Sequence, residues 1–277
     1  MKYIITAKGG DDVNSGNGLY AGGTPIQQTE SATELIYNRL TAISYLKEGY
    51  IDFNTTVVTL KERKFLYENI FKNVEIYDSR KKYDNCIDLV TESKLNELVN
   101  PTTNKYKPFY HKFDRDKEEI FNIRYNKDII NSEFTDFMIC IPRLKNSDTR
   151  RNLDQSYWGE FLKLAKSKYK NIFVFGKGNE NLEDDQIKYV DTLQDYCSYL
   201  HHPNCVDIVS TISGPCHYGQ FFGNSNFRTK MTMIDNLGLI NMHGDDPSYF
   251  DPCVNFTKIS IKFINTLVSP YELLLNL

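Results

Sequence analysis

Short apolar runs alternate with amphipathic stretches along the whole chain. Residues 2–7 form a first apolar run that ends in a glycine-rich stretch at 9–23, and a helical spacing of Leu35, Leu40, Ile43 and Leu46 follows. The β-branched run at 55–60 predicts a second strand. Residues 62–71 have a helical pattern, and 74–77 and 84–90 have strand patterns. The first half therefore predicts a repeated order of strand, loop and helix.

A second cycle begins after a polar, proline-containing middle segment. Apolar runs at 137–141, 171–175, 207–212 and 230–234 predict strands, and 157–169 and 193–200 show helical spacing. We expect a last helix over 256–267. Alternating strands and helices favour parallel sheets. The pattern therefore predicts an α/β protein with two Rossmann-like domains, an N-terminal one at 1–130 and a C-terminal one at 131–277. The last helix of the C-terminal domain would pack either within that domain or back on the N-terminal domain.

Composition and charge narrow the functional classes. Of the 277 residues, 40% are hydrophobic and 25% are charged, which is ordinary for a globular domain. The net charge of −3 shows no concentrated basic surface of the kind that nucleic-acid binding uses. No apolar run reaches the length of a membrane span or of a signal peptide. We therefore expect a cytoplasmic protein without a membrane span. A bias toward Asn, Lys, Ile, Asp and Tyr is typical of an AT-rich viral or bacterial genome.

The residues that are candidates for ligand binding follow the predicted strands. A basic loop follows the strand at 137–141 and carries Arg143, Lys145, Arg150 and Arg151. Gly176 follows the strand at 171–175. A glycine there either lets the backbone approach a nucleotide closely or simply forms a turn. In open parallel sheets, ligands bind beyond the carboxyl ends of the strands. Arginine and lysine there would hold phosphate without a metal ion, and a solvated surface loop is the alternative.

Ser213-Gly214-Pro215-Cys216-His217 opens a predicted helix directly after the strand at 207–212. Backbone N–H groups at a helix start favour phosphate binding. His217 would contact phosphate or ribose, or would simply pack at the helix start. This turn, the basic loop and the following Trp158 resemble the C-terminal domain of heptosyltransferase-like glycosyltransferases of the GT-B type. That family usually has Asp before the Ser, whereas this chain has Ile212.

The first strand leads into a second, weaker match to the same family. Gly10-Asp11-Asp12-Val13 stands where the family has a Gly-Asp-Val-like element. The resemblance implies that an Asp here is the catalytic base, and Asp12 aligns best. The adjacent Asp11 would raise the pKa of one of the two carboxyls by charge repulsion, and an Asp-capped turn is the alternative.

The resemblance implies sugar transfer from a nucleotide-sugar donor to a glycan hydroxyl, with inversion and without a metal ion or other cofactor. Three alternatives remain: a glycosyltransferase acting on modified bases of phage DNA, a sugar-nucleotide epimerase, and an inactive GT-B-like binding module. Asp114-Arg115-Asp116 fits a metal–nucleotide D-x-D pattern, but it lies in a charged run and not after an apolar strand. A glycine pattern at 15–22 does not fit the dinucleotide-binding spacing.

Overall fold

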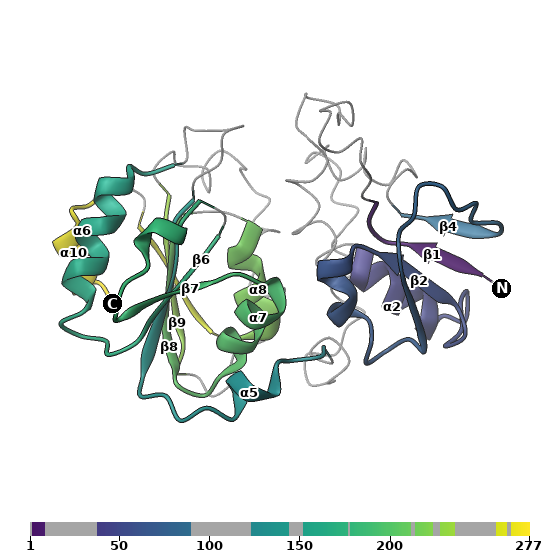
Figure 1. Cartoon of the computed structure of the whole chain (residues 1–277), viewed down its shortest axis with the longest axis horizontal. Helices are drawn as coiled ribbons and strands as arrows, with labels where there is room; N and C mark the ends of the chain where they lie inside the picture. Colours follow the sequence, from purple (N-terminus) through teal and green to yellow (C-terminus); the bar gives the residue numbers. More distant parts are fainter. Residues whose placement is uncertain are drawn as a thin grey trace. The chain divides into compact units, whose positions relative to one another are not determined.

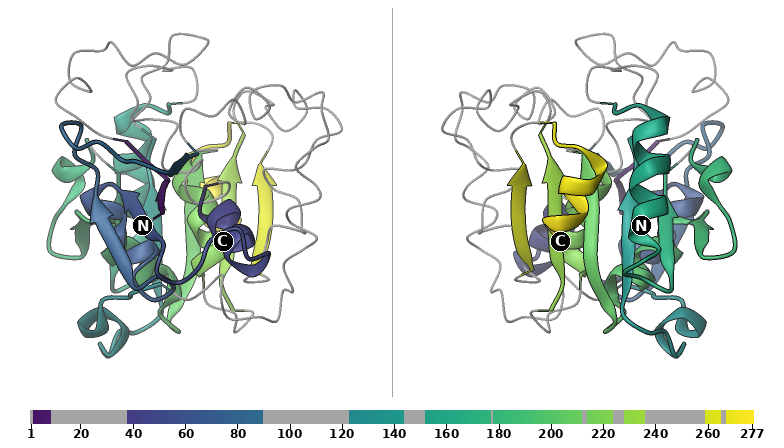
Figure 2. Two further views of the ribbon diagram at one scale, coloured as in Figure 1. Left: turned by 90° about the vertical axis from the view of Figure 1, so that its right-hand side faces the viewer. Right: turned by 90° about the vertical axis from the view of Figure 1, so that its left-hand side faces the viewer.

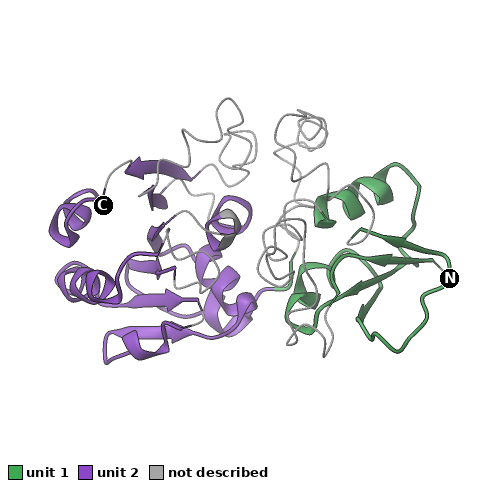
Figure 3. Cartoon of the chain, turned by 90° about the horizontal axis from the view of Figure 1, so that it is seen from above, with its two compact units in different colours: residues 1–124 green, residues 125–277 purple. Residues whose placement is uncertain are grey.

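The computed structural model consists of two compact units, Met1–Arg124 and Tyr125–Leu277 (Figure 3). The structure describes residues 2–8, 38–89, 123–143, 152–176, 178–211, 214–223, 228–235, 259–264 and 267–277. Each unit contains one parallel sheet. The predicted fold class, α/β with two parallel sheets, is confirmed.

The first unit has a four-stranded sheet in the order β3-β2-β1-β4, with every pair of neighbours parallel. Its described elements are β1 (Tyr3–Ile5), α2 (Arg39–Lys47), β2 (Thr56–Thr59), the 3-10 helix η3 (Lys61–Leu66), β3 (Asn73–Ile76) and β4 (Cys86–Asp88). The central strands β1 and β2 supply buried apolar residues such as Ile4 and Val57, each with no exposed surface. The edge strand β3 has no fully buried residue. The core of this unit therefore lies around β1 and β2.

The second unit has a six-stranded parallel sheet in the order β10-β9-β8-β5-β6-β7. Its described elements are α5 (Lys127–Ile130), β5 (Phe137–Ile141), α6 (Gln155–Ala165), β6 (Ile172–Phe175), η7 (Glu180–Leu182), β7 (Ile187–Val190), α7 (Leu193–His201), β8 (Cys205–Thr211), α8 (Gly214–Phe222), β9 (Lys230–Ile234), β10 (Ser260–Ile264) and α10 (Pro270–Leu275). Counted along the chain within this unit, the strand order is 6-5-4-1-2-3. This is the order of dinucleotide-binding folds.

Helices cover both faces of the six-stranded sheet. α6 and α10 lie side by side on one face, and α7 and α8 lie on the other (Figures 1 and 2). β5 is buried at all five positions because helices cover both of its faces. The sheet of the second unit is therefore the middle layer of three.

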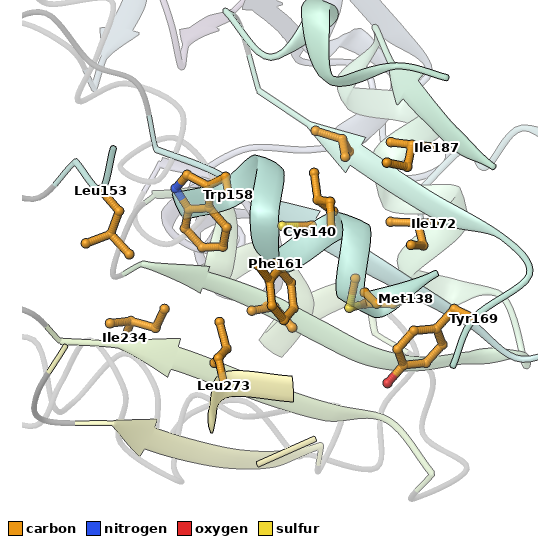
Figure 4. Packing of buried hydrophobic residues seen from close by; sticks show 14 of the residues in the cluster. Met138, Cys140, Leu153, Trp158, Phe161, Tyr169, Ile172, Ile187, Ile234 and Leu273 are labelled. Carbon is orange, nitrogen blue, oxygen red and sulfur yellow. The ribbon is translucent and has the colours of Figure 1, made fainter. Parts of the chain in front are cut away.

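The helical spacing predicted around Trp158 becomes the buried face of α6. Trp158, Phe161 and Ala165 have no exposed surface and pack on residues of β5 and β6 (Figure 4). Leu273 of α10 belongs to the same cluster of buried residues. The helix α10 thus packs on α6 within the second unit.

The helix predicted over 256–267 is wrong in its described part. Ser260–Ile264 is the edge strand β10, in register with β9 from Ser260 opposite Lys230 to Ile264 opposite Ile234. Its residues alternate between more exposed and less exposed positions, which suits an edge strand. The apolar spacing of this segment is compatible with both a helical and a strand period. Pairing with β9 therefore determines that the segment is a strand. The described helix that follows begins at Pro270, after Ser269, whose side chain forms a capping box with Glu272.

Candidate functional site

The strand order of the second unit reverses between β5 and β8. From β5 the chain proceeds to β6 on one side, and from β8 it proceeds to β9 on the other. At such a switch point the two connections diverge, and ligands of open α/β sheets bind outside the carboxyl ends of these strands. The residues that directly follow Ile141 and Thr211 therefore define the candidate site.

A hydroxyl group ties the two strands together at this switch point. Ser210 Oγ lies 3.0 Å from the carbonyl oxygen of Ile141 and 2.6 Å from that of Thr211. Its single proton serves one of these carbonyls at a time. Ser210 has no exposed surface, so this hydrogen bond is buried. The last residues of β5 and β8 are thereby held at a fixed separation.

Arg143 lies two residues beyond the end of β5. Its side chain is 5% exposed, and Nη1 donates a hydrogen bond to Asn152 Oδ1 at 3.3 Å, shortly before α6 begins. A largely buried guanidinium beyond a strand end places a fixed positive charge at the switch point. Of the four basic residues predicted in this loop, Arg143 is the one that the structure describes.

The turn after β6 has an unusual backbone, as the glycines in the sequence suggested. Gly176 has φ of +115° and Gly178 has φ of +95°, both conformations that side chains with a Cβ rarely adopt. A Cβ on Gly176 would lie 3.2 Å from Asn179 Nδ2. Glycine is therefore favoured at this position for two reasons, its conformation and the amide of Asn179 beside it.

Asn179 connects this turn to the end of β5. Its Nδ2 donates to the carbonyl oxygen of Pro142 at 2.9 Å and lies 3.3 Å from that of Phe175, while its backbone N–H donates to Gly176 at 3.2 Å. Asn179 has no exposed surface. Sequence reasoning missed this residue, because an Asn after Gly-x-Gly indicates a turn and does not reveal a contact 37 positions away.

The start of α8 is held by a residue of α7. Tyr196 Oη donates to the carbonyl oxygen of Pro215 at 2.9 Å, and its ring stacks on Phe175 at 4.1 Å between centroids with 6° between planes. Burial raises the pKa of the Tyr196 phenol well above its ordinary value, so the hydroxyl stays a neutral donor. Tyr196 thus links the end of β6 to the first turn of α8, and sequence reasoning missed it as well.

The structure brings together those predicted residues that it describes. Arg143 follows β5, Gly176 follows β6, and Gly214 and Pro215 open α8 after β8. Because β6, β5 and β8 are neighbours and parallel, these residues lie along one edge of the sheet. His217 is the fourth residue of α8, at the end of its first turn, and its side chain is not described by the structure. Outside the described residues are Asp11, Asp12, Lys145, Arg150, Arg151 and Ser213.

The first unit has a switch point of its own, between β1 and β4. Lys8, shortly after β1, forms an ion pair with Asp88, the last residue of β4. Both side chains are part-buried, with 25% and 18% exposed. The sequence pointed instead to Asp11 and Asp12 in this region, and it gave no signal for a contact across 80 positions.

The described part of the chain contains neither a metal-binding cluster nor a membrane-spanning helix. No cluster of three or more His, Cys, Asp or Glu side chains there has the arrangement of a metal site. Asp114 and Asp116 lie outside that part. Among the helices that the structure describes, none combines the length and the apolar character needed to cross a membrane.

No family model matches the sequence, and no curated protein matches it. The structure is similar to that of the E. coli heptosyltransferase WaaC with ADP, at 10% identity and a TM-score of 0.49, over 99% of this chain and 96% of that one. E. coli ADP-heptose LPS heptosyltransferase II matches at 10% identity and a TM-score of 0.49, over 100% and 98%.

Proposed function

We propose that this protein is a glycosyltransferase of the GT-B type that takes its sugar from a nucleotide-sugar donor. The observation that carries the proposal is the switch point of the second unit. There, Arg143, the glycine turn after β6 and the start of α8 lie along one sheet edge. A cation and the positive end of a helix together suit a diphosphate. The second unit is therefore the donor side, and the first unit is the acceptor side.

In the proposed reaction, an acceptor hydroxyl attacks the anomeric carbon of the donor sugar. The new bond forms between the acceptor oxygen and that carbon, and the bond from the carbon to the diphosphate oxygen breaks. The electron pair leaves with the nucleoside diphosphate, and the hydroxyl proton goes to a carboxylate base. We propose Asp12 as this base, with Asp11 beside it. Attack from the face opposite the leaving group inverts the anomeric configuration.

The leaving diphosphate gains negative charge as its bond to the sugar breaks. Preorganised donors aimed at that charge lower the barrier because they need no rearrangement during the reaction. Arg143 supplies one such group, and the first turn of α8, from Gly214, supplies backbone N–H groups. Lys145, Arg150, Arg151, Ser213 and His217 complete the proposed donor site. These groups would take the place of a divalent metal ion.

The test is a thermal-shift screen with UDP, GDP, ADP, CMP and dTDP, each with and without EDTA. A ligand that binds only the native state raises Tm. We expect one nucleotide to raise Tm in the presence of EDTA. A shift that EDTA abolishes would contradict metal independence, and the absence of any shift would overturn the proposal of a nucleotide-sugar enzyme.

Two arginine variants then locate the site. Arg143→Met removes the charge at the switch point, and we expect the nucleotide-induced shift to shrink. Arg228→Met is the matched control, because Arg228 pairs with Asp136 just before β5 at the opposite, amino-terminal edge of the same sheet. Equal loss of the shift in both variants would show that Arg143 has no special role in binding.

A further inference from the structure

The loops of the candidate site are joined by side chains that the reaction itself does not use. Asn179 connects the segments that follow β5 and β6 through the carbonyl groups of Pro142 and Phe175. Tyr196 connects the end of β6 to the start of α8 through its stack on Phe175 and its hydrogen bond to Pro215. These contacts run without a break from β5 to α8 along the edge where the diphosphate is proposed to bind.

Both linking side chains are fully buried, and Asn179 Nδ2 and Tyr196 Oη donate to backbone carbonyls. Asn179 and Tyr196 each have no exposed surface. The orientation of the Asn179 amide is set by its surroundings, since only Nδ2 can donate to the two carbonyl oxygens beside it. The donating groups of both residues are therefore engaged by the backbone of the protein. What they fix is the distance between three loops that come from different strands.

We propose that Asn179 and Tyr196 form a positioning brace that sets the geometry of the diphosphate site. This inference rests on the proposed function, because it assigns the brace to the nucleotide-binding loops. Binding by fixed donors requires their positions to be held within a fraction of an ångström. The brace supplies this by holding the Pro142–Arg143 backbone, the turn at Gly176 and the first turn of α8 in one arrangement. We expect the loss of either member to misplace the donors of the site.

The experiment compares nucleotide affinity and thermal stability in three variants. Asn179→Ala removes the link between the loops after β5 and β6, and Tyr196→Phe removes only the hydroxyl that holds α8. Thr229→Ala is the matched control, because fully buried Thr229 donates to the carbonyl oxygen of Cys205 at 2.7 Å, just before β9 at the amino-terminal edge of the same sheet. Each change removes a hydrogen bond from a residue with no exposed surface to the backbone. The ligand is whichever of UDP, GDP, ADP, CMP or dTDP binds the wild type.

We expect Asn179→Ala to weaken the Kd of that nucleotide by roughly 10- to 100-fold, as small misplacements of binding groups do. Tyr196→Phe should weaken it by a smaller factor, and Thr229→Ala should lower Tm with little change in Kd. A merely structural role would leave Kd in the folded protein unchanged in all three variants, and this result would overturn the brace alone. If Asn179→Ala does not fold, Tyr196→Phe decides by the same criterion. If no nucleotide binds the wild type, this result would overturn both the proposed function and the proposed role of the brace.

Discussion

Replacing Gly176 by alanine should destabilise the second unit more than the loss of one glycine ordinarily would. With φ of +115°, Gly176 occupies a region that an L-residue enters at a cost of about 1–3 kcal/mol. The added methyl group would also stand 3.2 Å from Asn179 Nδ2. Asn179 cannot move away freely, because its amide is held by the carbonyl of Pro142. The two effects add, so we expect a cost near 3 kcal/mol.

For a unit of this size, each kcal/mol lowers Tm by about 2–4 °C, so Gly176→Ala should lower it by about 6–12 °C. Differential scanning calorimetry of the whole chain measures this shift. Gly159→Ala is the control in the same unit, because Gly159 is helical and a Cβ there would meet nothing within 4 Å. That change should stabilise the unit by about 0.5–1 kcal/mol. An unchanged Tm in Gly176→Ala, or equal shifts in the two variants, would refute the conformation described for this turn.

Two further changes test the packing and the electrostatics of the second unit. A methyl group on Gly219 would lie 2.3 Å from Met231 Cε and 3.3 Å from Ile208 Cδ1, so in Gly219→Ala the end of the buried Met231 side chain must move within a packed core. We expect a cost of about 1–3 kcal/mol in chemical denaturation, and a neutral result would contradict the close packing of Met231 against α8. Asp207 is 4% exposed and accepts a hydrogen bond from Tyr169 Oη, and burial raises the pKa of its carboxyl from the ordinary value of 3.8. Because the pKa is raised in the folded state, the protonated carboxyl stabilises the fold at low pH. This stabilisation is lost as the pH rises from the ordinary pKa through the raised pKa. Asp207→Asn should therefore remove a decline of Tm over that window, and parallel curves of Tm against pH for variant and wild type would contradict this.

The described strands and helices were largely predictable where burial repeats with a clear period. The run at 137–141 became β5, and the spacing of Trp158, Phe161 and Ala165 became the buried face of α6. These segments could be predicted because a period of 3.6, or an unbroken apolar run, is a local property. The segment at 260–264 was assigned to the wrong class because its partner β9 lies about 30 residues away and sets its conformation.

The sequence allowed only those residues of the candidate site to be predicted that follow the end of a predicted strand. Arg143, Gly176 and Gly214 could be proposed because each directly follows a predicted strand, and parallel strands bring their carboxyl ends to one edge. The links through Asn179 and Tyr196 could not be proposed, since they join residues 37 and 19 positions apart and depend on the strand order. The same holds for Lys8 and Asp88, which the order β1-β4 brings together.

The most direct test of the central claim is to map the nucleotide onto the protein by NMR. The nucleoside phosphate that gives the largest thermal shift is titrated into ¹⁵N-labelled protein, and the backbone amide signals are followed. The account predicts the largest changes at Arg143, Gly176, Gly178 and Gly214, at the carboxyl ends of β5, β6 and β8. Changes confined to the amino-terminal edge of the sheet, around Asp136 and Thr229, or no saturable changes at all, would contradict it.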